Sequence, residues 1–212
     1  MIRVDNIVKY YGEHLALKGI SYTINKGEIV GFLGPNGAGK STMMRIITGY
    51  LPATSGFVYL DDYEIYDNPI ELKRKIGYMP ENISLYTEMT VIDYLKFAAK
   101  LKGISRKHIK SALENTIEIT GLTKYKDRII GHLSKGYKQR TGIAQAIIHD
   151  PEVLILDEPT SGLDPNQLIE VRSLIKSLGG TRTVILSTHI LSEVEDTCER
   201  ALIIDNGELI AE

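Results

Sequence analysis

The segment that most constrains this chain is Gly34-Pro-Asn-Gly-Ala-Gly-Lys-Ser41, between an apolar, β-rich run at 28–33 and a helix-like run that follows. A strand, this spacing of glycines and a helix, in that order, are typical of a phosphate-binding loop. Glycines let backbone N–H groups converge on phosphate oxygens, and the helix N-terminus adds a favourable dipole. The segment therefore predicts a nucleotide site, with Lys40 on the β- and γ-phosphates and Ser41 on Mg²⁺.

A second signal is the apolar run Val153-Leu-Ile-Leu156, which ends in Asp157 and Glu158. Acids at the carboxyl edge of a parallel sheet stand where ligands bind in such folds. Asp157 is predicted to complete the Mg²⁺ site, and Glu158 to act as the base on the attacking water. An apolar strand followed by two acids also occurs without a catalytic role. The 157 − 40 = 117 residues that separate Lys40 from Asp157 are too many for a small kinase or GTPase.

The middle of the chain differs in pattern from its two ends. The first third predicts short strands, whereas residues from about 88 to 150 predict a mostly helical insert. Helices are expected at Val91–Leu101 and at Ser105–Thr120, with Ser105 as the N-cap of the second. In that second helix one apolar stripe runs through Ile109, Ala112, Leu113 and Ile117.

Strand and helix patterns alternate in the last third. The predicted strands are 153–156, 183–187 and 201–204, and the predicted helices are 167–178 and 190–200. This alternation favours a parallel sheet with helices packed on its faces. Asp205-Asn-Gly-Glu208 predicts a hairpin turn. Because the chain stops soon afterwards, at Glu212, we expect it to be a fragment of a longer protein.

Composition excludes several classes of protein. The 25 Lys and Arg against 27 Asp and Glu give a net charge of −2, which argues against binding to nucleic acid by counterion release. The basic run Lys100, Lys102, Arg106, Lys107 and Lys110 is interpreted as a solvated helix face. No apolar stretch approaches the ~18 residues of a membrane span, and the single Cys198 excludes an internal disulfide. We expect an intracellular protein.

Three further motifs carry a resemblance. Leu133-Ser-Lys-Gly-Tyr137, Ser161-Gly-Leu-Asp164 and Ser187-Thr-His189 follow the phosphate loop in the order found in the ATP-binding domain of ABC transporters, which this chain resembles over its whole length. In that comparison 133–137 is the signature, 161–164 the aspartate loop and His189 the switch histidine. Tyr11, before Gly12, is similar to the adenine-stacking aromatic, and Gly77-Tyr-Met-Pro-Glu81 stands in place of the glutamine loop.

The resemblance implies a fold. It is an α/β P-loop NTPase with a mixed sheet core, an N-terminal antiparallel β subdomain and a helical subdomain inserted in the middle. The whole of 1–212 would be a single ATPase domain. Residues 1–87 and 151–212 would form the core with the β subdomain, and about 88–150 the helical subdomain with the signature.

The resemblance also implies a site for ATP and Mg²⁺. Two such domains would pair head to tail, with Ser134 and Gly136 binding the γ-phosphate of ATP held by the opposite subunit and Asp164 joining the two sites. His189 would contact the γ-phosphate, and Ser41, Asp157 and Glu81 would hold Mg²⁺. The remaining nucleotide contacts would come from Tyr11, Gly34, Asn36, Gly37, Ala38, Gly39, Lys40, Ser41 and Thr42.

The chain departs from the family pattern at two places. Glu81 stands where most members carry glutamine, so its catalytic role is a hypothesis. In the signature, Lys135 and Tyr137 replace glycine and glutamine, while Ser134 and Gly136 are kept. These departures resemble the ATPases of type-two ABC exporters, including the gliding-motility group, whose members often carry a further C-terminal region.

The function implied by the resemblance is ATP hydrolysis that drives transport, with export favoured, through separate membrane-spanning permease subunits. The second ATPase subunit would be a copy of this chain or a related one, and no nucleic acid is expected. The chain would be cytoplasmic, held at the inner face of the cell membrane by the permease, which is expected to dock near 81–88 with Leu85 and Tyr86 as candidates. The alternative is a non-transport ABC ATPase. Chromosome and repair members carry a long coiled coil and translation factors two tandem domains, whereas this chain has neither pattern.

Overall fold

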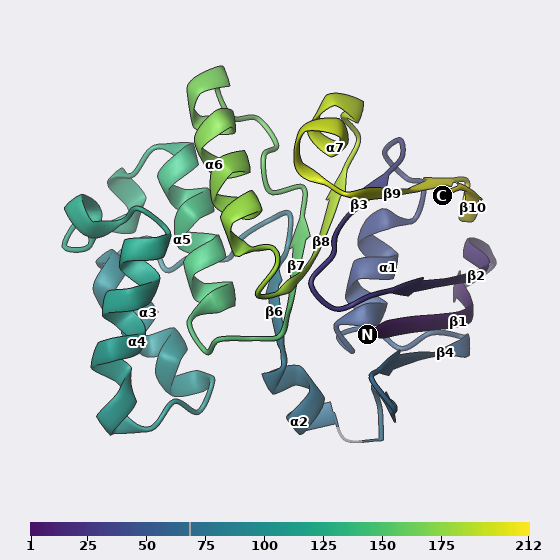
Figure 1. Ribbon diagram of the computed structural model, residues 1–212, viewed down its shortest axis with the longest axis horizontal. Coiled ribbons are helices and arrows are strands. Elements are labelled where there is room, and N and C mark those ends of the chain that lie inside the picture. Colours follow the sequence, from purple (N-terminus) through teal and green to yellow (C-terminus); the bar gives the residue numbers. More distant parts are fainter. Residues whose placement is uncertain (68) are drawn as a thin grey trace.

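The fold was analysed in a computed structural model that describes residues 1–67 and 69–212. It contains two sheets, with helix α1 (Lys40–Ile47) between them and further helices on the opposite side of the larger sheet (Figure 1). An α/β fold with a mixed central sheet and an antiparallel N-terminal sheet is therefore confirmed.

The larger sheet has the strand order β10-β9-β3-β8-β7-β6. All its neighbours are parallel except β10, which pairs antiparallel with β9. Because β3, β8, β7 and β6 run in one direction, their carboxyl ends lie along one edge of the sheet. The six strands are β3 (Ile29–Leu33), β6 (Ile76–Met79), β7 (Val153–Asp157), β8 (Thr183–Thr188), β9 (Arg200–Asp205) and β10 (Glu208–Ala211).

The sequence of strand β7 is continuously apolar because both faces of the strand are buried. Val153 and Ile155 pack into the hydrophobic cluster that contains α1, whereas Leu154 and Leu156 pack into the cluster on the other face. That second cluster contains α5 (Lys135–Ile147) and α6 (Pro165–Leu178). A strand covered on both faces has no polar side, so its alternation disappears.

The N-terminal sheet has the antiparallel order β2-β1-β4-β5. The prediction of short strands is wrong here, because β1 (Ile2–Tyr11) and β2 (His14–Ile24) have 10 and 11 residues. Register shifts interrupt their pairing, one of them between Val4 and Ile7, and break the two-residue period that a long strand would show. β4 (Ser55–Leu60) and the short β5 (Tyr63–Glu64) complete this sheet.

Between β6 and β7 the chain is helical, as predicted. α3 (Val91–Leu101) and α4 (Arg106–Ile119) pack with the start of the signature region around their own hydrophobic cluster. α3 has the predicted bounds, and Ser105 is the N-cap residue of α4, although its side chain accepts no capping hydrogen bond. The remaining helical segments are α2 (Pro69–Arg74) and the 3-10 turns η1 (Thr123–Tyr125) and η2 (Ile130–His132).

The C-terminal part contains one correction. The helix predicted over 190–200 is shorter, since α7 spans Leu191–Thr197. Arg200 already pairs with Val30 at the start of β9, so the chain must leave the helix earlier. The predicted hairpin is confirmed between β9 and β10, where Asn206 and Gly207 both adopt positive φ, 46° and 78°.

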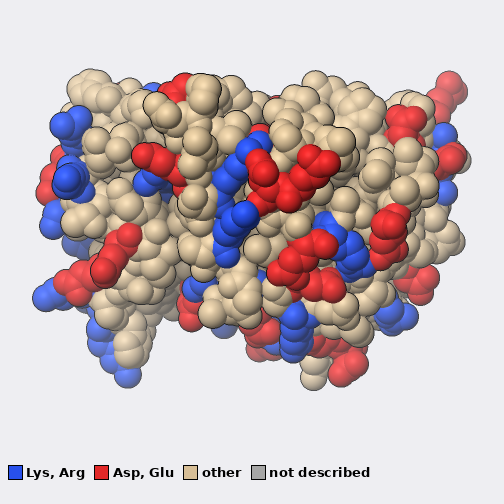
Figure 2. Space-filling model, turned by 45° about the horizontal axis from the view of Figure 1, so that its top comes forward, with Lys and Arg blue, Asp and Glu red and all other residues tan. Residues whose placement is uncertain are grey.

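Across residues 1–67 and 69–212, no helix is long and apolar enough to cross a membrane. The surface carries charges of both signs, and Lys and Arg gather at the end of the molecule formed by α3 and α4, on the left in Figure 2. This positive region is balanced by acidic residues elsewhere, since the whole chain has a net charge of only −2.

His149 fastens the segment after α5 to the sheet. Its Nε2 lies 3.2 Å from the carbonyl oxygen of Ile76 in β6. Burial, with a smaller contribution from the positive charge of Lys102, lowers the pKa of His149 to about 4. The folded protein therefore holds this imidazole neutral at pH values where an unfolded chain protonates it.

We predict that His149 makes the protein less stable in acid. Between its ordinary pKa of about 6.5 and its folded pKa the unfolded chain binds more protons, so stability falls as pH drops through this window. Urea unfolding at several pH values should show that the wild type loses roughly 1–3 kcal/mol more from pH 7 to 4 than His149→Gln does. The exposed His132→Gln is the control. Equal pH profiles for wild type and His149→Gln would contradict the prediction.

Candidate active site

The phosphate loop occupies the turn between β3 and α1. Gly34 donates its backbone N–H to the carbonyl oxygen of Thr188 over 3.3 Å. A Cβ at Gly34 would lie 2.1 Å from the carbonyl oxygen of Ile204, so no other residue fits. Gly39, at the start of α1, has φ 106°, which glycine adopts at no steric cost. The loop is therefore shaped by β8 and β9 as well as by its own sequence.

Lys40 is almost fully buried, although it is charged. Its ammonium donates to the carbonyl oxygens of Gly34 (2.8 Å) and Pro35 (3.1 Å) and lies 3.5 Å from Glu158 Oε1. A buried cation needs such partners, because desolvation is costly. These contacts place the ammonium inside the arc of the loop, where a nucleotide's phosphates would compete for it.

Ser41, Asp157 and Ser187 form a chain of hydroxyl and carboxylate groups. Asp157 Oδ1 accepts hydrogen bonds from Ser41 Oγ at 3.1 Å and from Ser187 Oγ at 2.5 Å. Mg²⁺ prefers oxygen ligands and is usually bound by one or two protein groups together with phosphate oxygens. In the described ranges, 1–67 and 69–212, no cluster of three or more His, Cys, Asp or Glu could hold a metal by itself. This donor set therefore fits Mg²⁺ only as a joint ligand with a nucleotide.

Glu158 follows directly at the end of β7 in a strained conformation. Its φ is 50°, which is rare for residues other than glycine. Its N–H donates to both the carbonyl oxygen and the hydroxyl of Ser187, at 3.2 and 3.0 Å, which holds it there. His189 Nδ1 lies 3.0 Å from Glu158 Oε2. The carboxylate and the imidazole, from adjacent strands, thus meet beside Lys40.

A cavity of about 360 Å³ opens in front of the phosphate loop. The structure brings nine predicted residues to its wall, namely Tyr11, Asn36, Gly37, Gly39, Lys40, Ser41, Thr42, Glu81 and Glu158. The predicted residues Ala38 and Gly34 do not line the cavity; Ala38 instead accepts a hydrogen bond from the Gly207 N–H at 3.0 Å.

His14 also lines this cavity, although it belongs to none of the sequence motifs. It pairs directly with Tyr11 across the β1–β2 hairpin, with Gly12 in the turn at φ 58°. A hairpin turn recognised at Gly12 would have pointed to His14, because residues opposite each other across a hairpin share a face.

The signature lies elsewhere. Ser134 caps α5, and Gly136 donates its N–H to Gln167 Oε1 over 3.0 Å. Asp164 caps α6 by accepting from the Gln167 N–H at 2.9 Å. Ser134, Gly136 and Asp164 therefore cluster with each other, and none of them lines the cavity in front of the phosphate loop. The chain therefore carries two separate groups of predicted site residues.

Tyr137, the unusual signature residue, turns away from this cluster. Its ring stacks on Tyr125 with 3.8 Å between the ring centroids. The guanidinium carbon of Arg140 lies 5.5 Å from the centroid of the Tyr137 ring. Lys135 is exposed and approaches Gly162, where an added Cβ would lie 2.3 Å from its Nζ. Tyr137 thus packs within the helical region, whereas Lys135 faces the aspartate loop.

Sequence reasoning missed Glu193, a buried acid on α7. It accepts hydrogen bonds from Thr160 Oγ1 at 2.6 Å and from Thr188 Oγ1 at 2.5 Å, with Arg172 at 3.8 Å. Thr160 follows the acidic strand end, and Thr188 precedes His189. One carboxylate therefore holds the segment after Glu158 and the strand end before His189.

A phosphate loop at the carboxyl edge of a parallel sheet, with two consecutive acids at the end of β7 and only β8 between that strand and β3, defines a P-loop nucleotide hydrolase. Comparison with known proteins agrees. A family model described as ABC transporter matches residues 17–161.

Relatives and solved structures extend the match over the whole chain. The linearmycin resistance ATP-binding protein LnrL of Bacillus subtilis is 41% identical over 212 residues, 100% of this chain and 68% of that protein. The bacitracin transport ATP-binding protein BcrA of Bacillus licheniformis is 40% identical over 100% of this chain and 69% of its own length. The ATP-binding cassette MJ0796, solved as a dimer in a post-hydrolysis state with ADP and Pi, superposes with a TM-score of 0.87 at 28% identity, covering 100% of this chain and 97% of that one.

The chain belongs to the ABC transporter family. It is an ATP-binding subunit of the type that hydrolyses ATP, and the resemblance seen in the sequence motifs is confirmed.

We predict that Glu193→Ala destabilises the protein by roughly 2–4 kcal/mol, because two buried hydroxyls lose their acceptor and Arg172 keeps only Asp196 as a carboxylate partner. Urea unfolding would measure the change. Glu195→Ala, an exposed acid on the same helix, is the control and should stay within about 0.5 kcal/mol of the wild type. A loss in Glu193→Ala no larger than in the control would show that this hydrogen-bond network is not structural.

Proposed function

We propose that this chain is the ATP-hydrolysing subunit of an exporter and works as a head-to-tail pair, either with a second copy or with a related chain. The observation that carries the proposal is the separation of Ser134 and Gly136 from the cavity in front of the phosphate loop. Neither half-site alone surrounds a triphosphate, and pairing two chains would join the cavity of each to the signature of the other.

In this arrangement the cavity residues hold ATP. Tyr11 would stack on the adenine, while the loop's backbone N–H groups and Lys40 would bind the phosphates. Ser41 and Asp157, already hydrogen-bonded to each other, would hold Mg²⁺ through their oxygens. Bound there, Mg²⁺ would neutralise charge on the phosphates.

Glu158 is the proposed base, because it lies on the cavity wall with its Oε1 3.5 Å from the ammonium of Lys40. It would take a proton from the attacking water. His189, 3.0 Å from Glu158, would orient that carboxylate and contact the γ-phosphate. Glu81 faces the same cavity from the segment after β6 and would position the water or the ion.

Across the dimer interface, Ser134 and the Gly136 N–H would bind the γ-phosphate at the N-terminus of α5. Asp164, at the N-terminus of α6, would join the two sites. Loss of the γ-phosphate on hydrolysis would remove the link between subunits and open the pair.

The permease would dock on the surface formed by the segment after β6 and by α3. Tyr86 is 55% exposed and packs edge-on against Tyr94 and Phe97, so it is available to a partner. Leu85 packs in the helical cluster instead. A surface hollow of about 620 Å³, which includes Phe97 and Ile129, adjoins them. Through this contact the chain would be held at the inner face of the cell membrane, in the cytoplasm.

Export is the proposed direction because LnrL is described by linearmycin resistance and BcrA by bacitracin transport. We further propose that about 88–150 acts as a helical subdomain, since α3 and α4 have their own hydrophobic cluster. The alternative of a non-transport ABC ATPase has no structural observation in its favour within the described residues.

The proposed mechanism predicts the effect of Glu158→Gln, which keeps the shape of the side chain but removes the base. ATP hydrolysis should fall by at least about 100-fold, and bound ATP should hold two chains together. Gel filtration with light scattering should show a monomer without nucleotide and a dimer with Mg-ATP. Glu152→Gln, at an exposed position directly before β7, is the matched control and should remain active. A variant that binds ATP tightly yet never dimerises would refute the head-to-tail mechanism.

A further prediction of this mechanism concerns Gln167, whose side chain covers Gly136. Its Oε1 accepts the hydrogen bond from the Gly136 N–H that the γ-phosphate would need. Closure requires this hydrogen bond to break. In the Glu158→Gln background, Gln167→Ala should therefore tighten ATP-dependent dimerisation by about fivefold. Gln167→Glu should weaken it by roughly tenfold, because a carboxylate binds the N–H more strongly and repels phosphate. Analytical ultracentrifugation would measure both; shifts in the same direction would argue against this competition.

A further inference from the structure

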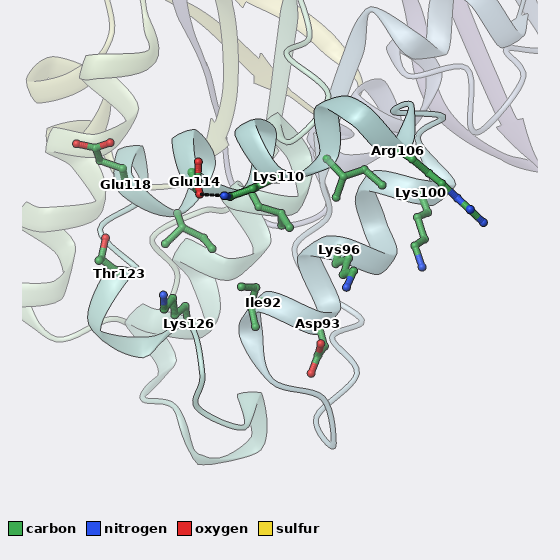
Figure 3. Close-up of a pocket in the computed structure, with 13 residues that line it drawn as sticks. Ile92, Asp93, Lys96, Lys100, Arg106, Lys110, Glu114, Glu118, Thr123 and Lys126 are labelled. Atoms are coloured by element: carbon green, nitrogen blue, oxygen red, sulfur yellow. Dashed lines mark ion pairs between the residues drawn. The ribbon is translucent and has the colours of Figure 1, made fainter.

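Asp157, at the end of β7, is a buried carboxylate without a cationic partner. It is 1% exposed, and in the part of the chain that the structure describes no Lys, Arg or His forms an ion pair with it, since Lys40 pairs with Glu158 instead. Exposed acids differ. In the hollow between α3 and α4, Glu114 lies 3.9 Å from Lys110 (Figure 3). Because an unpaired buried charge is costly, Asp157 needs a positive charge from outside the chain.

The hydroxyl of Ser187, near the end of the neighbouring strand β8, bridges two consecutive acids. Ser187 is fully buried and pairs with Asp157 in the register of the two strands. Its Oγ donates to Asp157 Oδ1 over 2.5 Å and accepts the Glu158 N–H over 3.0 Å. Since a backbone N–H can only donate, the single hydroxyl proton of Ser187 is left for Asp157. The direction of both hydrogen bonds is therefore fixed.

These contacts make the two oxygens of Asp157 unequal. Ser41 Oγ, 3.1 Å away, donates to the same Oδ1 as Ser187 does. Among the described residues no side chain or backbone N–H donates to Oδ2. Oδ1 cannot turn toward a metal ion without losing a hydrogen bond from a hydroxyl. While both hydroxyl contacts persist, Asp157 can therefore offer a metal ion one oxygen but not two.

We propose that Ser187 is a positioning residue that makes the metal site prefer Mg²⁺ to Ca²⁺, because it holds the Asp157 carboxylate to a single free oxygen. This rests on the proposed function, in which Ser41 and Asp157 hold Mg²⁺. Mg²⁺ is small and demands near-octahedral geometry from few protein groups, whereas Ca²⁺ takes more oxygens and binds carboxylates through one or both of theirs. A carboxylate that cannot turn suits the first ion better than the second.

Ser187 also has a contact that could serve the backbone alone. Its hydroxyl helps to hold Glu158, whose φ is 50°. The carbonyl oxygen of Ser187 accepts the same Glu158 N–H over 3.2 Å. Loss of the hydroxyl therefore leaves Glu158 one of these two hydrogen bonds, whereas Asp157 loses the shorter of its two. Ser187→Ala consequently tests the carboxylate of Asp157 more than the backbone of Glu158.

The test measures nucleotide binding by the full chain rather than hydrolysis. Glu158→Gln is the background, so that ATP carrying a fluorescent methylanthraniloyl group stays intact. Its dissociation constant is measured with Mg²⁺, with Ca²⁺ and with EDTA, and the background should bind more tightly with Mg²⁺ than with Ca²⁺. Ser187→Ala should reduce this Mg²⁺ preference roughly tenfold, as the loss of an outer-shell partner does at metal sites, and should change binding in EDTA by less than about twofold.

Thr183→Val is the matched control, because it removes a buried hydroxyl at the other end of β8 and should keep the Mg²⁺ preference. Ser187→Cys keeps a similar shape with a weaker donor, so it should lower the preference by less than Ser187→Ala. An unchanged preference in both Ser187 variants would overturn the inference. An equal loss with Mg²⁺, Ca²⁺ and EDTA would also overturn it, since it would show a structural role alone. Dimerisation of the Glu158→Gln background with Mg-ATP tests the proposed function separately, so the two failures can be told apart.

Discussion

The site depends above all on the parallel register of β3, β8 and β7. Leu33 pairs with Thr188, and Asp157 with Ser187, so the three strands end at nearly the same level. The phosphate loop, His189 and Glu158 all leave the sheet from that level. Because the hydrogen bonds of a parallel ladder fix this alignment, a slip of one residue would turn Asp157 away from Ser41.

Helix α5 links the site to the helical end of the molecule. Its first turn carries Gly136, its middle packs against the sheet through Ile143 and Ala146, and Ala144 belongs to the cluster of α3 and α4. A movement of α3 and α4 caused by a partner would therefore displace α5 and with it the signature residue Gly136. Since packed interiors deform little, one rigid helix can carry such a displacement. This gives a physical route between the proposed docking surface and ATP.

Much of the site could be predicted because its chemistry is local in sequence. The loop residues from Gly34 to Thr42 would act through backbone N–H groups and one lysine, and the spacing of the glycines and the lysine is enough to predict this role. The acids Asp157 and Glu158 end an apolar strand. By contrast, Glu193 and Gln167 act on residues 33 and 31 positions away, through contacts that form only when strands and helices are assembled. The length of β1 and β2 was missed for a related reason, because bulges disrupt the period on which strand prediction depends.

The sequence by itself determined the class of fold, the nucleotide chemistry and the family, because a glycine-rich turn followed by Lys-Ser has few other uses and the later motifs keep their order. The tertiary structure alone decided that Ser134 and Gly136 lie apart from the cavity they are expected to complete, and that Gln167 covers Gly136. These are distances between elements far apart in the chain, and packing sets them rather than any local pattern.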